Sequence, residues 1–266
     1  MIKIGCNSLS MRDMGVEDFI RTCHELRLDS IDFHESAFAS REPAYLASIR
    51  LLCLKYGLPI AYIGVSGLFH GTAEERREHA DKAKGVIDLA AFLGAPLIRM
   101  FCATVPEKNG DGEPAWPAMI AGYREVADYG AERGVSVGLQ NHPVTGDDML
   151  RIRADVGRDN FNFLVDTGQW VGSPGSQPVG VTDPAHDFYG YMEQTVPYAT
   201  CIRTKFYRIE SGREEWLDYE RIVSIIRNAN YNGCLSIVYE GKQPDQVEQV
   251  RLGAAYLREL FGTDRC

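Results

Sequence analysis

Polar and charged residues recur at alternate positions near the ends of short apolar segments, a spacing that could gather them into one site. Successive side chains of a β-strand point to opposite faces, so residues two apart share a face. The positions that fit this spacing are Asp32 and His34, Gln140 and His142, Asp166, Arg203 and Lys205, and Glu240, with Arg99 closing a further segment. Buried charges are costly without partners, so we expect these groups to compensate one another or to bind a ligand.

Residues of these types could move a proton next to a carbonyl group. That chemistry needs a base to remove the proton and a positive group to stabilise the enolate oxygen. Glu240 and His142 are the candidate bases, and Arg203 and Lys205 are the candidate electrophiles. The structural alternative is an ion pair between Arg203 and Asp166 that only fills the space between the strands.

Further residues near the same segment ends are candidates for binding a substrate. A planar guanidinium binds carboxylates, phosphates or vicinal hydroxyls through directional donors, and sugar rings stack on aromatic side chains. We expect the substrate to contact His34, Arg99, Gln140, Asp166, Gln169 and Trp170.

The apolar segments alternate with amphipathic segments along the whole chain. Strands are expected near residues 2–8, 29–34, 59–65, 96–102, 135–141, 161–166, 199–205 and 233–240, and helices near 15–26, 42–56, 73–93, 115–133, 146–157, 185–196, 217–229 and 244–261. Eight such units favour a closed parallel barrel, and 266 residues is close to the ~250 typical of a (β/α)8 TIM barrel. We predict one barrel domain over residues 1–266.

A doubly wound open sheet is the alternative fold. No G-x-G-x-x-G motif follows the first expected strand, which weakens that alternative. Active sites of (β/α)8 barrels lie at the C-terminal ends of the strands, so the barrel would gather the polar residues at one mouth. The long loops at 103–114 and 170–184 follow strands and are candidate lids over that mouth.

Composition restricts the class of partner. The formal net charge of −9 argues against non-specific binding to nucleic acid or to anionic membranes. The seven cysteines are dispersed and form no C-x-x-C pair, which is typical of a reducing compartment. No signal peptide or long apolar span is evident, so we predict a cytoplasmic protein.

Four segments resemble motifs of the sugar phosphate isomerase/epimerase family, the xylose isomerase-like TIM barrels. They are GVSVGLQNH at 134–142, LVDTGQ at 164–169, RTKFY at 203–207 and the closing strand YNGCLSIVYEG at 231–241, and residues 89–99 resemble the junction before the fourth strand. The resemblance implies a TIM barrel that acts on a sugar. It also implies a divalent metal held by Glu, Asp, His and Glu from strands five to eight.

At the positions of those four metal ligands this chain has Gln140, Asp166, Arg203 and Val238. Arg203 has no acceptor atom and Val238 has no lone pair, so neither can bind a cation. We therefore predict no metal cofactor at this location. The alternative is a displaced site for Mn, Mg, Co or Zn, built from Glu240 with Asp32, His34 or His142.

The leading interpretation is a sugar or keto-sugar isomerase or epimerase whose metal site is largely lost. A first alternative is a non-catalytic carbohydrate-binding protein or a partner subunit of a sugar-processing complex. A second alternative is a lyase or dehydratase, which needs the same proton abstraction. The expected partner is a small sugar or sugar derivative, and the chain could also form a homo-oligomer.

Overall fold

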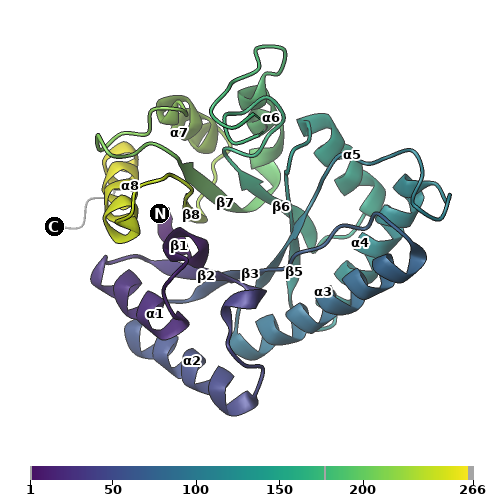
Figure 1. The fold of residues 1–266 in the computed structure, drawn as a ribbon, viewed down its shortest axis with the longest axis horizontal. Coiled ribbons are helices and arrows are strands. Elements are labelled where there is room, and N and C mark those ends of the chain that lie inside the picture. Colours follow the sequence, from purple (N-terminus) through teal and green to yellow (C-terminus); the bar gives the residue numbers. More distant parts are fainter. Residues whose placement is uncertain (1, 177, 263–266) are drawn as a thin grey trace.

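Eight parallel strands close into a barrel in their sequence order, with the helices on the outside (Figure 1). The computed structural model describes residues 2–176 and 178–262. The strands are β1 (Lys3–Asn7), β2 (Ser30–His34), β3 (Ile60–Gly64), β4 (Leu97–Phe101), β5 (Ser136–Gln140), β6 (Phe161–Asp166), β7 (Ala199–Phe206) and β8 (Cys234–Tyr239).

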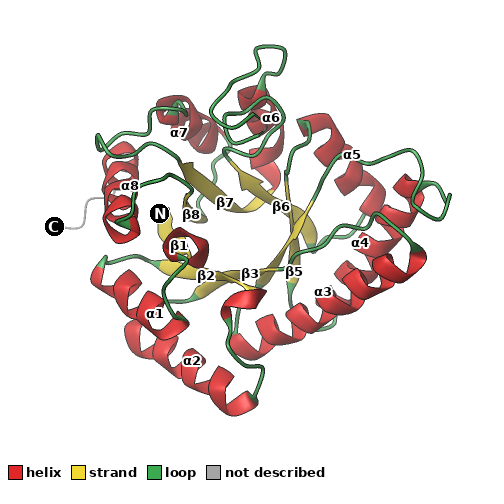
Figure 2. Ribbon diagram, viewed as in Figure 1, coloured by secondary structure: helices red, strands yellow, loops and turns green. Residues whose placement is uncertain are grey.

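The eight helices of the ring alternate with the strands (Figure 2). They are α1 (Val16–Glu25), α2 (Pro43–Tyr56), α3 (Ala73–Leu93), α4 (Ala115–Ala131), α5 (Gly146–Val156), α6 (Phe188–Thr195), α7 (Tyr219–Asn228) and α8 (Gln246–Phe261). The (β/α)8 prediction is confirmed, and the open sheet is wrong because β1 pairs with both β2 and β8.

Local sequence signals fix where several helices begin and end. Thr72 and Glu75 form a reciprocal capping box at the start of α3. Gly94 ends the same helix with φ of 80°, a left-handed conformation that glycine adopts without steric cost. These signals explain why the predicted bounds of α3 agree with the structure.

Alternation along the strands separates an outer apolar face from the barrel interior. Phe33 of β2 points outward and meets Phe19 of α1 with ring centroids 5.5 Å apart. Its neighbour Asp32 points inward and is fully buried. The lower interior is filled by a small apolar cluster that includes Leu97 and Leu164. The part of the interior near the C-terminal ends of the strands is polar, so the charged side chains of the strands lie at the C-terminal mouth.

The loop at 103–114 is tied to the side of the barrel. Arg76 of α3 forms ion pairs with Asp111 at 3.0 Å and with Glu113 at 2.9 Å. A lid role for this loop and for 170–184 stays a prediction. Within the described ranges no helix has the length and apolar character needed to cross a membrane. Six of the seven cysteines are free, and Cys266 lies outside the described residues.

Candidate functional site

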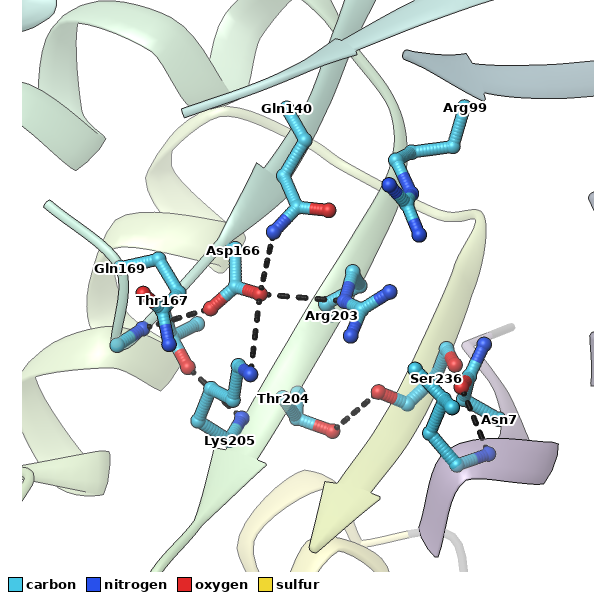
Figure 3. Close-up of polar contacts among 12 residues, drawn as sticks. Asn7, Arg99, Gln140, Asp166, Thr167, Gln169, Arg203, Thr204, Lys205 and Ser236 are labelled. Atoms are coloured by element: carbon cyan, nitrogen blue, oxygen red, sulfur yellow. Dashed lines mark hydrogen bonds and ion pairs between the residues drawn. The ribbon is translucent and has the colours of Figure 1, made fainter. Parts of the chain in front are cut away.

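Asp166, at the end of β6, is the centre of the buried polar network in the mouth (Figure 3). Its Oδ2 accepts hydrogen bonds from Arg203 Nε at 3.1 Å and from Gln140 Nε2 at 3.0 Å, and Lys205 Nζ lies 3.6 Å away. Its Oδ1 accepts from the backbone N–H of Gly168 at 3.0 Å. The predicted ion pair between Arg203 and Asp166 is therefore confirmed, and three neighbouring strands meet at one carboxylate.

Lys205 links this carboxylate to a second one. Its Nζ donates a short hydrogen bond to Glu240 Oε1, just beyond the end of β8. Gln169 approaches the other Glu240 oxygen at 3.5 Å. Burial alone would raise the pKa of Glu240, but the charges of Lys205 and Arg203 outweigh it and hold that pKa below its usual value. Glu240 is consequently an ionised carboxylate near neutral pH.

A second polar layer lies deeper in the barrel. Asp32 accepts hydrogen bonds from Ser236 Oγ at 2.6 Å and from Asn7 Nδ2. Tyr62 crosses the interior, and its hydroxyl accepts from Asn7 at 3.0 Å and from Arg203 Nη1 at 3.1 Å. Burial raises the pKa of Asp32, although these hydrogen bonds act in the opposite direction. The layer holds the Arg203 guanidinium in position through the Tyr62 hydroxyl.

The supporting residues of this layer were not among the predicted site residues. Asn7, Tyr62 and Ser236 occupy inward positions of β1, β3 and β8 and are almost completely buried. The same alternation that indicated Asp32 could have found them. A tyrosine or serine in a strand is often a packing residue. Alternation alone therefore indicates that such a residue faces inward but does not assign it to a site.

Arg99 is a buried guanidinium at the inner face of β4, only 1% exposed. It lies 3.9 Å above the ring of Phe101 and donates to the carbonyl of Val65 at 3.4 Å. A Cβ at Gly64 would stand 2.6 Å from its Nη2, so a larger residue on β3 would require the Arg99 side chain to shift. Burial, followed by the nearby charge of Arg203, lowers the pKa of Arg99 to about 9.

Two histidines lie around the mouth, and both are neutral near pH 7. Partial burial is the main cause that lowers the pKa of His142, with a smaller effect from Lys205. Burial and then Arg99 lower the pKa of His34 to about 4. The His34 ring bonds Ser66 Oγ at 2.8 Å, so it is held at the rim on the β2–β3 side.

A cavity of about 580 Å³ opens beside the mouth. It is lined by Ser66, Gly67, Leu68, His70 and Gly71 of the loop after β3, by Glu75 and His79 of α3, and by Phe101, Ala103 and His142. Phe101 also packs against Arg99, and its ring centroid lies 5.1 Å from that of His142. The volume lies within the range of small-molecule sites. The cavity therefore adjoins the buried charges through the Phe101 and His142 side chains.

The structure brings most of the predicted site residues to one mouth. Gln140, Asp166, Arg203, Lys205 and Glu240 form a continuous chain of contacts, extended by Gln169. Arg99, His34 and His142 surround it.

Trp170 lies apart from this chain of contacts. Its side chain is completely buried, and its ring centroid is 5.9 Å from that of Tyr191 in α6. The structure thus packs Trp170 against α6, and its role in substrate binding stays a prediction.

The chain is similar in sequence to one known protein family. A family profile described as "Xylose isomerase-like TIM barrel" matches residues 20–260. The chain belongs to the xylose isomerase-like TIM barrel family. No curated protein sequence matches the chain.

Among solved structures, 3-keto-D-glucoside 4-epimerase from E. coli is similar with a TM-score of 0.78 and 15% identity, covering 97% of this chain and 100% of its own. A D-psicose 3-epimerase determined in the presence of D-fructose has a TM-score of 0.77 and 15% identity, with 98% and 99% covered. A xylose isomerase domain protein from Planctomyces limnophilus has a TM-score of 0.73 and 15% identity, with 97% and 95% covered. At these identities the likeness shows the fold alone.

The metal that the family resemblance implies does not fit the four corresponding side chains of this xylose isomerase-like barrel. Asp166 Oδ2 already accepts from Arg203 and Gln140, so a cation there would face a guanidinium. Val238 offers only carbon atoms. Across residues 2–176 and 178–262, no three or more His, Cys, Asp or Glu side chains are grouped so as to hold a metal ion. Glu240, the centre of the alternative displaced site, is paired with Lys205.

Proposed function

We propose that the mouth binds a small sugar or keto-sugar and isomerises or epimerises it, with protein cations in the place of a divalent ion. The observation that carries the proposal is the position of Lys205. Its ammonium lies between two carboxylates, 3.6 Å from Asp166 and hydrogen-bonded to Glu240, at the strand ends where barrel enzymes bind their substrates. A fixed positive charge in a buried setting can stabilise a developing enolate oxygen.

His142 is the favoured base. Its lowered pKa keeps the imidazole neutral and able to accept a proton, and the ring lines the cavity beside the mouth. Glu240 is less available as a base because its carboxylate accepts a hydrogen bond from Lys205. We assign to Glu240 the positioning of Lys205 and the exchange of a proton with it.

The reaction then divides into two proton transfers. His142 removes the proton from the carbon next to the carbonyl, and the electron pair of the broken C–H bond moves into the enolate. Lys205 stabilises the enolate oxygen. A proton returned to the opposite face of the same carbon from the Lys205–Glu240 pair gives the epimer, and His142 and the pair then exchange protons with solvent. For the isomer, the hydroxyl on the deprotonated carbon loses its proton and becomes the new carbonyl, the enolate oxygen takes up a proton, and the carbon proton returns to the former carbonyl carbon. Loss of a β-hydroxyl from the same enolate would instead give a dehydratase.

A non-catalytic carbohydrate-binding protein or partner subunit is the second candidate. It is favoured by the mutual pairing of Asp166, Arg203, Lys205 and Glu240, because such a network can be structural. The two candidates differ in whether the protein breaks a C–H bond.

Deuterium exchange tests this difference directly. A panel of ketoses and 3-keto-glucosides is incubated with the protein in D₂O, with and without a chelator, and incorporation next to the carbonyl is followed by NMR. We expect exchange that survives chelation and falls by about 10²-fold or more in His142→Asn and in Lys205→Met. Arg77→Met, at an exposed ion pair with Glu125 on the outer face, is the matched control.

Three outcomes would contradict the proposal. Exchange that requires added Mn²⁺ would mean that the reaction depends on a metal. Ligand binding without any exchange would support the non-catalytic candidate. Equal exchange rates in the wild type and in His142→Asn would remove His142 from the mechanism.

A further inference from the structure

Two buried polar atoms at the mouth are left without partners, and they are of opposite kind. Arg99 Nε is a donor and Gln140 Oε1 is an acceptor, and neither has a hydrogen-bond partner among the described residues. Both side chains are 1% exposed. They come from the neighbouring strands β4 and β5, where Gln140 pairs with Phe101, two residues beyond Arg99. Figure 3 shows the Gln140 oxygen on the side of its amide that faces Arg99.

Asp166 decides which way the Gln140 amide points. Gln140 Nε2 donates to Asp166 Oδ2 at 3.0 Å, and a carboxylate can only accept. The flipped amide would place its oxygen against that carboxylate, so the observed orientation is the favourable one. The Gln140 oxygen is therefore held away from Asp166 as an available acceptor.

Arg99 is the cation of the network without a carboxylate contact. Arg203 and Lys205 both take part in ion pairs with Asp166, and Lys205 in one with Glu240 as well, whereas no ion pair of Arg99 occurs within the described ranges. The Phe101 ring and the Val65 carbonyl stabilise it in part. A buried cation without an anion is expensive, so a ligand that supplies one gains more there than in water.

The two unpartnered atoms together favour one class of ligand. A carboxylate alone would satisfy Arg99 but repel the Gln140 oxygen. A neutral polyol could donate to Gln140 but would leave the Arg99 charge uncompensated. An anionic group with a hydroxyl on the neighbouring carbon satisfies both, because the carboxylate accepts from the guanidinium and the hydroxyl donates to the amide oxygen.

We propose that Arg99 and Gln140 form a hydroxy-acid subsite, so that the natural ligand of the mouth is a sugar acid or a related hydroxy acid rather than a neutral sugar. This inference rests on the proposed function for the identity of the site but adds the substrate class. In it Arg99 and Gln140 are substrate-binding residues, and Asp166 positions Gln140.

Matched pairs of acid and neutral ligands test the subsite. The pairs are D-gluconate with D-glucitol and D-glycerate with glycerol, and binding is measured by calorimetry and by ligand-observed NMR. We expect the acid of at least one pair to bind about tenfold or more tightly than its neutral partner. Acetate, which lacks the hydroxyl, should bind more weakly than the acid with the hydroxyl.

Variants separate the contribution of the Arg99 guanidinium from that of the Gln140 amide. Arg99→Met should reduce binding of the acid to that of its neutral partner, while Arg99→Lys, which keeps the charge without the fork, should retain part of it. Gln140→Met should weaken the hydroxy acid but leave acetate unchanged. Arg77→Met is again the control. Circular dichroism shows whether each variant is folded, and Arg99→Lys supplies the comparison if Arg99→Met is not.

The results discriminate this inference from the proposed function. Three results would overturn the subsite: neutral ligands that bind as tightly as the acids, no binding by any acid, or acid binding that is unaffected in both Arg99 variants. In each case the partner of Arg99 and Gln140 would be a bound water. Deuterium exchange with neutral ketoses would still support the proposed reaction in that case. Acids that bind through Arg99 without any exchange would instead confirm the subsite and contradict the proposed catalysis.

Discussion

Asp166→Asn removes the negative charge on which the upper network depends, with almost no change in shape. Asp166 is completely buried and lies 3.1 Å from Arg203 Nε and 3.6 Å from Lys205 Nζ. At an effective dielectric constant of about 20, each ion pair at such distances is worth about 5 kcal/mol. The desolvation of the carboxylate offsets several kcal/mol of that attraction, and Lys205 keeps its contact with Glu240.

We therefore expect Asp166→Asn to lower the free energy of unfolding by about 3–5 kcal/mol, the range for breaking a buried pair at one partner. Urea unfolding followed by tryptophan fluorescence measures this free energy by linear extrapolation. Asp128→Asn is the matched control, because Asp128 pairs with Arg158 at the exposed surface. That change should cost no more than about 1 kcal/mol.

A double-replacement cycle shows whether the effect is electrostatic. Asp166→Leu combined with Arg203→Met removes both charges and should cost less than the sum of the two single changes. A loss below about 1 kcal/mol for Asp166→Asn, or strictly additive single changes, would refute the view that the buried ion pair holds the mouth together.

The remaining predictions concern protons and metal. The pKa of His34 is lowered to about 4 from 6.5, so the neutral form is favoured in the fold. Its contribution to stability is complete above about pH 6.5 and is lost as the pH falls towards 4, and the urea midpoint of His34→Gln should fall less over that interval than that of the wild type. The triple variant Gln140→Glu, Arg203→His and Val238→Glu rebuilds the ligand set that the family resemblance implies, and calorimetry should show Mn²⁺ binding at least about tenfold tighter than in the wild type. A folded triple variant without that gain would mean that the strand ends have been wrongly matched to the family.

Much of the fold could be predicted because its determinants are local. The signals are strand alternation, helix amphipathicity and terminal glycines such as Gly94, and each arises from residues close together in the sequence. The same alternation also indicated that Asp32 and Arg203 point inward, and their hydrogen bonds across the barrel interior, to Ser236 and Tyr62 respectively, confirm it. The ion pair between Arg203 and Asp166 followed from one further step, since β6 and β7 are neighbours in a barrel that closes in sequence order.

The finer organisation of the site could not be predicted. Lys205 can reach two carboxylates. Its short hydrogen bond to Glu240 depends on the position of that residue in the loop after β8. Trp170 was indistinguishable in sequence from an aromatic residue that faces a ligand, yet it is buried beside α6. Loop side chains carry no periodic signal that reports their direction.

The sequence by itself determined the barrel and the inward direction of the charged residues, because both follow from residue type and short-range periodicity. That Arg203 and Val238 stand where metal ligands are expected is an implication of the family resemblance and not of periodicity. Only the tertiary structure decided how the charges pair. Asp166 and Glu240 are matched by Arg203 and Lys205. The guanidinium of Arg99 lies over the Phe101 ring, and the Gln140 oxygen has no hydrogen-bond partner among the described residues. Pairing depends on distances of a few ångströms between strands far apart in the chain, and such distances are set by barrel closure and packing.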